Sequence, residues 1–154
     1  KVLDLVRRYL DLGCPGITLA DTTGMANPRQ VAALVEQALP LVGADALTLH
    51  LHNTRGLGLA NVVAAYDAGA QRFDAALGGL GGCPFAPGAS GNICTEDLVA
   101  MCEEMGIPTG LDLPALIALS RGLPALIGHE TAGQVAKAGR VADLHTAPPG
   151  LRAA

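Results

Sequence analysis

A short apolar strand, a polar loop and an amphipathic helix follow one another repeatedly along this chain, at a spacing of about 28 residues. Strands are expected at residues 17–20, 46–52 and 72–77, and helices at 28–41 and 58–66. Alternation of this kind favours right-handed βαβ units and a parallel sheet. The chain is therefore expected to be an α/β protein with about three βα units.

Further helices are expected on both sides of this repeat. Residues 2–12 show helical spacing of apolar side chains and end at Gly13. Thr95 precedes two acidic residues, which predicts an N-cap and the first turn of a helix through Met105. Another helix is expected within 108–123, and an irregular tail over 128–154.

The first residue is also informative. The chain begins at Lys1, without Met and already inside a helical pattern. We therefore expect it to be a piece of a longer protein, with one partial domain over residues 1–127 and the tail over 128–154. Three βα units would leave open sheet edges, so these 154 residues alone are expected to be unstable or self-associating and without function by themselves.

Composition excludes several classes of protein. The 154 residues carry 10 Lys+Arg against 14 Asp+Glu and a net charge of −4, which argues against a nucleic-acid partner. Half of the residues are hydrophobic and 16% are charged, which is typical of a chain with a core and not of disorder. Aromatic residues make up only 3%, so the core is expected to be aliphatic.

The same composition bears on location. No apolar run reaches the roughly 18 residues of a membrane span, and no signal-peptide pattern opens the chain, so no membrane partner is expected. The four cysteines form no CxxC pair and are interpreted as reduced thiols. The expected location is the cytoplasm, or the mitochondrial matrix in a eukaryote.

Residues 78–94 interrupt the strand–helix alternation. This segment holds six glycines and two prolines in 17 positions and little charge. A long irregular segment inside a compact domain is usually functional or disordered, and the low charge and the helix signal that follows it favour function.

Two histidines end the second strand. In Thr48-Leu49-His50-Leu51-His52, the side chains of His50 and His52 share one face, with Cα atoms about 6.5–7 Å apart. Active sites of α/β barrels lie at the carboxyl ends of the strands. We therefore interpret the pair as ligands of one metal ion, the alternative being two structural polar residues at a strand end.

Other polar residues are candidates for the same edge of the sheet. Asp21 ends the preceding strand and is expected beside the histidines, although it would serve equally as a loop-capping residue. Asp74 could support the site or simply be a polar residue of the barrel interior. Cys83 lies in the glycine-rich segment, where a thiol could move a proton or could be incidental. Asn92 offers an amide oxygen before a helix, or plain turn chemistry.

Three stretches resemble the 3-hydroxy-3-methylglutaryl-CoA lyases, a family of metal-dependent TIM-barrel enzymes. They are LADTTGMANP at 19–28, LHLHNTRGLGLANV at 49–62 and GGLGGCPFAPGASGNICTED at 78–97. The HxH pair is shared with related synthases, aldolases and carboxyltransferase domains, whereas the glycine-rich stretch is specific to the lyases. The resemblance implies the C-terminal part of a (β/α)8 barrel over residues 1–127, of the type shared with pyruvate carboxyltransferases.

The resemblance also implies roles for individual residues. His50, His52 and Asn92 match metal ligands, and His50 is also credited with proton transfer. Cys83 matches the loop cysteine that moves a proton, and Asp21 matches an active-site carboxylate near the substrate. The family's Arg-Asp pair and a Glu lie on early strands that this sequence does not contain.

The implied substrate subsite and partners follow from the same likeness. Gly81 and Gly82 are expected to let the backbone approach the substrate closely. The implied cofactor is Mg²⁺ or Mn²⁺, because mixed nitrogen and oxygen ligation suits these ions better than a structural zinc site. The partner is an acyl-CoA substrate, and the full-length enzyme is expected to be a homodimer.

The implied reaction is cleavage of 3-hydroxy-3-methylglutaryl-CoA to acetoacetate and acetyl-CoA by the full-length enzyme. Two alternatives stay open, namely a lyase for another 3-hydroxyacyl-CoA and a non-catalytic barrel fragment. A Claisen-type synthase fits less well because those enzymes lack the cysteine loop. A metallohydrolase would need further His and Asp ligands on later strand ends, where Asp74 is the one candidate.

Overall fold

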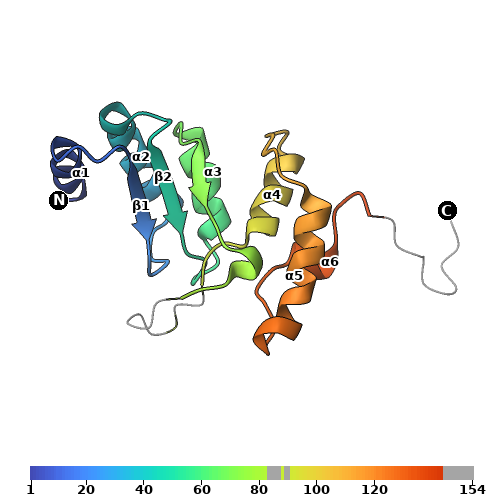
Figure 1. Ribbon diagram of the computed structural model, residues 1–154. Helices are drawn as coiled ribbons and strands as arrows, with labels where there is room; N and C mark the ends of the chain where they lie inside the picture. Colours follow the sequence, from blue (N-terminus) through green and yellow to red (C-terminus); the bar gives the residue numbers. More distant parts are fainter. Residues whose placement is uncertain (83–87, 89–90, 144–154) are drawn as a thin grey trace, which may run out of the picture.

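A computed structural model describes residues 1–82, 88 and 91–143. Helices and strands alternate along the first half of the described chain, and helices dominate the second half (Figure 1). The elements are α1 (Val2–Asp11), β1 (Ile17–Asp21), α2 (Pro28–Val42), β2 (Leu47–Leu51), α3 (Gly58–Asp67), β3 (Arg72–Asp74), the 3-10 helix η1 (Leu77–Gly79), α4 (Thr95–Glu104), α5 (Leu113–Ile127) and α6 (Val135–Ala138).

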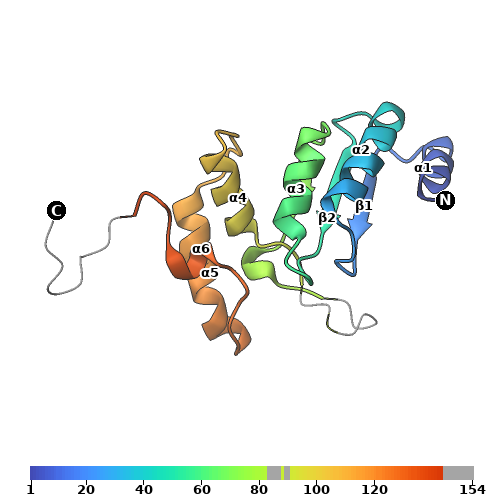
Figure 2. The ribbon, with the colours of Figure 1, turned by 180° about the vertical axis from the view of Figure 1, so that it is seen from behind.

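The three strands form one parallel sheet in the order β1-β2-β3. Helices α2 and α3 lie behind the sheet in Figure 1 and in front of it in Figure 2, so both cover the same face. Within the described residues, no helix covers the opposite face, and Thr18, Ala20 and Asp74 are exposed there. The predicted parallel βαβ arrangement is confirmed.

The core lies between the sheet and these two helices. Leu47, Leu49 and Leu51 alternate along β2 with half-buried residues and are almost fully buried. They pack in one cluster with side chains of α2 and α3, chiefly Val31, Val35, Ala38, Val62 and Ala65. Because successive residues of a strand face opposite sides, these leucines direct the residues between them to the uncovered face.

Helix α2 begins where the sequence predicts it. Asn27 accepts a hydrogen bond from the Gln30 backbone N–H, and the Gln30 side chain accepts one from the Asn27 N–H. Pro28 occupies the first helical position, where its missing N–H leaves no bond unmade. This start fixes where the loop that follows β1 ends.

The third strand is shorter than predicted. β3 ends at Asp74, whereas the strand was expected to continue to Leu77. Leu77 instead opens η1, in which Gly78 has a φ of 65°, a value that a strand does not allow. Ala76 forms a bridge with Cys94, so the segment at 91–94 continues the sheet edge beyond β3.

The start of α4 also differs from the prediction. Thr95 is the first helical residue, and the N-cap is Cys94, which makes no side-chain capping bond. Glu96 and Asp97 lie in the first turn, as expected, and both are buried. Their carboxylates accept hydrogen bonds from groups outside α4, so tertiary contacts decide their place.

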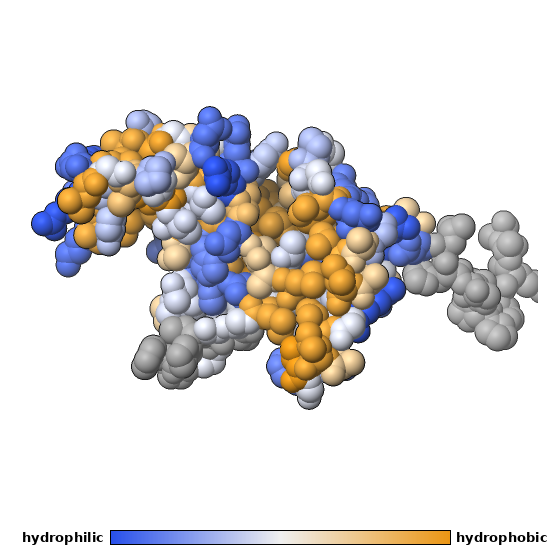
Figure 3. Space-filling view, in the orientation of Figure 1, coloured by the Kyte–Doolittle hydropathy of each residue, from blue (hydrophilic) through white to orange (hydrophobic). Residues whose placement is uncertain are grey.

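The last helices are displaced from their predicted positions. α5 covers Leu113–Ile127 instead of lying within 108–123, because Asp112 caps it by accepting from the Ala115 N–H. It ends at Gly128 in the left-handed region. The short helix α6 lies inside the segment that was expected to be irregular. Figure 3 shows hydrophobic surface gathered over α5, where Leu119 and Leu126 are exposed.

Candidate active site at the carboxyl edge of the sheet

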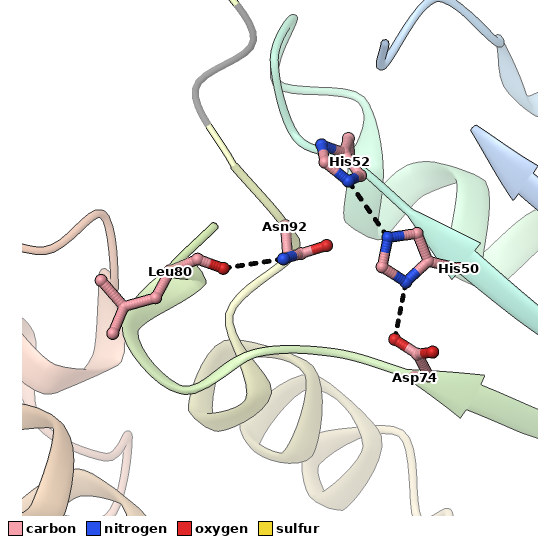
Figure 4. Close-up of polar contacts among 5 residues, drawn as sticks. All are labelled: His50, His52, Asp74, Leu80 and Asn92. Carbon is pink, nitrogen blue, oxygen red and sulfur yellow. Dashed lines mark hydrogen bonds and ion pairs between the residues drawn. The ribbon is translucent and has the colours of Figure 1, made fainter. Parts of the chain in front are cut away.

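Two imidazole rings meet at the carboxyl end of β2. Nε2 of His50 lies 3.1 Å from Nε2 of His52, and the ring centroids are 5.0 Å apart at an interplanar angle of 60° (Figure 4). The rings share one face because two residues span one period of a strand. The structure therefore brings the two rings together on one face, as predicted.

Asp74 supports the ring of His50 from the neighbouring strand. The register pairs His50 with Asp74, and Nδ1 of His50 lies 2.7 Å from Oδ1 of Asp74 (Figure 4). A carboxylate can only accept, so Nδ1 carries the proton of this bond and Nε2 of the neutral ring presents a lone pair. The sequence alone left the role of Asp74 open, because the register of the two strands decides it.

Asn92 lies on the other side of the histidine pair. It forms an antiparallel bridge with His52, and its Nδ2 donates a 2.7 Å hydrogen bond to the Leu80 carbonyl (Figure 4). Oδ1 of Asn92 and Nδ1 of His52 are buried and make no hydrogen bond with any described residue. A buried acceptor without a partner is unfavourable unless a ligand satisfies it.

These donor atoms fit a divalent cation. Two ligand atoms at right angles, each about 2.1 Å from one ion, lie about 3.0 Å apart, close to the Nε2–Nε2 distance of 3.1 Å. The Asp74 contact is the carboxylate–histidine arrangement that orients metal-binding imidazoles. Across residues 1–82, 88 and 91–143, no three His, Cys, Asp or Glu side chains form a metal site, and the candidate ligands at this edge are His50, His52 and the Asn92 amide.

The electrostatics keep His52 available as a ligand. Burial lowers the pKa of His52 below its ordinary value of 6.5, and the nearby His50 lowers it further, while Asp21 and Asp74 act in the opposite direction. A lowered pKa leaves the ring neutral at pH 7, and only a neutral imidazole ligates a metal.

Asp21 lies at the same edge but faces its own loop. Its two carboxylate oxygens accept 3.0 Å hydrogen bonds from the Met25 and Ala26 N–H groups, and its register partner is Leu51. It acts on His52 through its charge, and no hydrogen bond joins it to either histidine. The prediction placed Asp21 beside the pair; the loop-capping alternative describes its contacts in this structure.

The loop after β1 is also held by residues that the sequence analysis did not single out. Nη1 of Arg55 donates to the Thr23 and Gly24 carbonyls, each at 3.1 Å. The buried Asn61 of α3 donates to the Ala26 carbonyl. The loop after β1 is therefore tied to the loop after β2 and to α3, which makes this side of the edge rigid.

The glycine-rich segment is described in part. Gly81 has a φ of 105°, and a side chain there would approach Nδ2 of Asn92 to 2.7 Å, so only glycine fits. Gly82 is exposed. Cys83 lies outside the described residues, and its role stays a prediction, as do the substrate-binding roles of Gly81 and Gly82.

Two of the described cysteines have raised thiol pKa values, which suit them poorly to the proton-transfer role that the resemblance gives to Cys83. Cys94 is buried, and desolvation together with the nearby Asp97 and Glu96 raises the pKa of its thiol to about 12. Burial also raises the pKa of Cys102. Both were interpreted as incidental thiols.

We expect Cys94 to resist alkylation in the native protein. With a pKa of about 12, roughly one thiol in 10,000 is ionised at pH 8, against about a quarter for an ordinary cysteine. Iodoacetamide treatment followed by peptide mass spectrometry should label Cys94 only after unfolding. Native labelling of Cys94 as fast as that of the half-buried Cys14 would contradict this.

Within the described residues, none of the helices is long and apolar enough to span a membrane.

Comparisons with known proteins agree with the geometry. The HMGL-like family model matches residues 1–122. The chain is 52% identical over 141 residues to (R)-citramalyl-CoA lyase from Chloroflexus aurantiacus, which covers 92% of this chain and 44% of that protein. It is 42% identical over 128 residues to hydroxymethylglutaryl-CoA lyase YngG from Bacillus subtilis, which covers 83% of this chain and 43% of that protein.

A solved structure of an enzyme with a similar sequence also matches this chain. The HMG-CoA lyase from Acinetobacter baumannii, in complex with coenzyme A and 3-methylmalate, is 71% identical and superposes with a TM-score of 0.93, over 96% of this chain and 48% of that one. The chain thus spans just under half the length of these relatives, and the predicted partial barrel is confirmed. The lyase resemblance is confirmed as well: the chain belongs to the HMGL-like family.

Proposed function

We propose that this chain is the carboxyl-terminal part of a metal-dependent carbon–carbon lyase that cleaves a 3-hydroxyacyl-CoA and releases acetyl-CoA. The observation that carries the proposal is the convergence of His50 and His52, with Asp74 behind one ring. Beside the other ring lies Oδ1 of Asn92, which is buried and has no hydrogen-bond partner among the described residues. The first candidate substrate is 3-hydroxy-3-methylglutaryl-CoA, with acetoacetate as the second product.

Mg²⁺ or Mn²⁺ is the proposed cofactor, with His50, His52 and Asn92 as its ligands in this chain. Such a cation supplies Lewis acidity that lowers the pKa of the substrate's hydroxyl group. The reaction removes the hydroxyl proton, breaks the C2–C3 bond and leaves the bonding electrons on the acetyl-CoA enolate, which must then gain a proton.

The residues of this chain support those proton movements. Asp74 holds the ring of His50 through Nδ1, so the ring is oriented without depending on the substrate. We assign the return of a proton to the enolate to Cys83 on the strength of the sequence resemblance. The carboxylate of Asp21, turned toward the Met25 and Ala26 N–H groups, keeps the loop after β1 in place beside the substrate.

A second candidate substrate, (R)-citramalyl-CoA, is favoured by the 52% identity to a lyase with that name. Its acyl backbone is one methylene shorter than that of 3-hydroxy-3-methylglutaryl-CoA, and its cleavage releases pyruvate and acetyl-CoA. The 3-methylmalate bound by the Acinetobacter baumannii enzyme also has this shorter four-carbon backbone. One methylene in a pocket changes selectivity by roughly 10- to 200-fold, so a direct comparison of rates can separate the two.

The test is an assay of the complete protein on both thioesters, with acetoacetate, pyruvate and acetyl-CoA measured separately. We expect acetyl-CoA from at least one substrate, loss of activity with EDTA, and recovery with Mg²⁺ or Mn²⁺. Acetoacetate as the main second product supports the first candidate, and pyruvate supports the second. A folded, metal-supplemented protein that cleaves neither would overturn the proposal.

Asp74→Asn should lower the metal affinity and the activity without removing a proposed metal ligand. The amide can offer its NH₂ group to Nδ1 and so favours the wrong tautomer of His50, and changes of this kind reduce metal affinity or activity by about 10- to 100-fold. The measurements are the Mn²⁺ dissociation constant and kcat. Asp67→Asn, at an exposed carboxylate that ends α3, is the matched control and should leave both values unchanged.

A further inference from the structure

A buried acid, Glu96, lies outside the proposed metal site and has no role in the proposed reaction. Glu96, in the first turn of α4, has a relative exposure of 0%. Its Oε1 accepts a 2.6 Å hydrogen bond from the Ser120 hydroxyl on α5, and its Oε2 accepts a 3.0 Å bond from the Gly78 N–H in η1. Gly133 lies so close to Oε1 that a side chain there would overlap it, so the carboxylate is fully enclosed.

The Gly78 contact leads directly to Asn92. Gly78 is two residues before Leu80, whose carbonyl accepts the hydrogen bond from Nδ2 of Asn92. The intervening η1 turn is closed by bonds from Gly79 N–H to the Ala76 carbonyl and from Leu80 N–H to the Leu77 carbonyl. The position of the Leu80 carbonyl, which decides where the Asn92 amide points, therefore depends on how Gly78 is held.

The two ends of the glycine-rich segment lie close together. A side chain at Gly79 would come within 3.1 Å of the Asn92 carbonyl, and one at Gly91 would overlap the Gly79 and Gly81 carbonyls. These contacts couple the position of η1 to that of Asn92. An asparagine amide can take two orientations that differ by a half turn, and the one in this structure directs Oδ1 toward the histidines (Figure 4).

We propose that Glu96, fixed by Ser120, is a positioning residue that sets the orientation of the Asn92 amide through Gly78 and the Leu80 carbonyl. This inference deepens the proposed function, because it matters to the reaction only if Asn92 binds the metal. The orientation of Asn92 itself can be measured without metal or substrate, which keeps the two proposals separately testable.

Asp97 provides the matched control for a purely structural role. It is the neighbouring buried acid on α4, and its carboxylate accepts bonds from the Gln134 and Val135 N–H groups at the start of α6. Unlike Glu96, it accepts no hydrogen bond from η1 within the described residues. Glu96→Ala and Asp97→Ala both remove a buried carboxylate with backbone partners. If Glu96 only stabilises the fold, the two variants should behave alike.

The first measurement is the side-chain NH₂ signal of Asn92 in the complete protein labelled with ¹⁵N-asparagine, without added metal. In Glu96→Ala we expect this signal to shift and its hydrogen exchange to accelerate at least tenfold, with no change in Asp97→Ala. Glu96→Gln should restore the wild-type signal, because its carbonyl can accept from Gly78 and its NH₂ can donate to the Ser120 hydroxyl. An unchanged Asn92 signal in a folded Glu96→Ala protein would overturn the inference, as would equal changes in both alanine variants.

The second measurement is Mn²⁺ binding, followed by electron paramagnetic resonance. Glu96→Ala should weaken binding by about tenfold, in the range found for residues that orient metal ligands, while Glu96→Gln and Asp97→Ala stay within about twofold of wild type. Ser120→Ala is the second route if Glu96→Ala does not fold, and it should change the Asn92 signal in the same direction. A wild-type protein that binds no Mn²⁺ would contradict the proposed function but leave the Asn92 measurement decisive.

Discussion

Replacing His50 with alanine should abolish tight Mn²⁺ binding and lower kcat of the complete protein by about 1,000-fold, which corresponds to about 4 kcal/mol of transition-state stabilisation. The expected loss is large because His50 would supply Nε2 to the proposed cation site, and its Nδ1 contacts Asp74. The measurements are Mn²⁺ titration of the purified variant and the initial rate of acetyl-CoA release at saturating substrate.

His129→Ala is the matched control for this substitution. His129 lies beyond α5, is exposed, and has Nδ1 within 2.9 Å of the Glu130 carbonyl, away from the histidine pair. It should retain wild-type metal affinity and rate. A His50→Ala protein that binds Mn²⁺ as tightly as wild type would show that the metal, if any, is held elsewhere.

Gly91→Ala should be the most disruptive single methyl group in the glycine-rich segment. Gly91 has a φ of 117°, which only glycine adopts readily, and an added Cβ would overlap the Gly79 and Gly81 carbonyls. Backbone atoms cannot yield as a flexible side chain would, so we expect a loss of about 3 kcal/mol or more. At the size of a few hundred residues this corresponds to a fall in Tm of about 6–12 °C.

Gly88→Ala separates crowding from backbone strain. Gly88 has a φ of 77°, but a Cβ there meets no atom of the described residues within 4 Å. Its cost should be limited to the strain of about 1–2 kcal/mol for an alanine in the left-handed region, and its Tm should fall by a few degrees. Equal melting temperatures for the two variants, measured by differential scanning calorimetry, would refute the close packing of the segment ends.

The elements best predicted from sequence are those whose signals are local. The alternation of Leu49 and Leu51 with the two histidines specifies a strand and the face of each side chain. The Asn27-Pro28 pair marks the start of α2 by its own chemistry. By contrast, α5 begins later than predicted because the cap is Asp112, and several residues between Pro108 and Leu113 would serve equally well by pattern alone.

The parts that sequence reasoning missed or left open depend on contacts between distant segments. Asp74 reaches His50 only because the two are register partners on adjacent strands. Glu96 is a plausible surface acid by its place in a first helical turn, and its burial follows from Ser120, which lies on another helix. For Asp21 the sequence left two readings open, because a position at the sheet edge does not determine which way a carboxylate turns.

The alternation along β2 links the placement of the two histidines to the packing of the leucine core. Mutation would otherwise change these two properties independently. The strand that carries His50 and His52 on one side carries Leu49 and Leu51 on the other. An insertion or deletion of one residue between positions 47 and 52 would exchange the two sides, placing imidazoles in the aliphatic layer and leucines on the face of the proposed site. Evolutionary drift in this strand is therefore confined to substitutions, and lineages that diverge in substrate should retain its length while the loops after each strand vary.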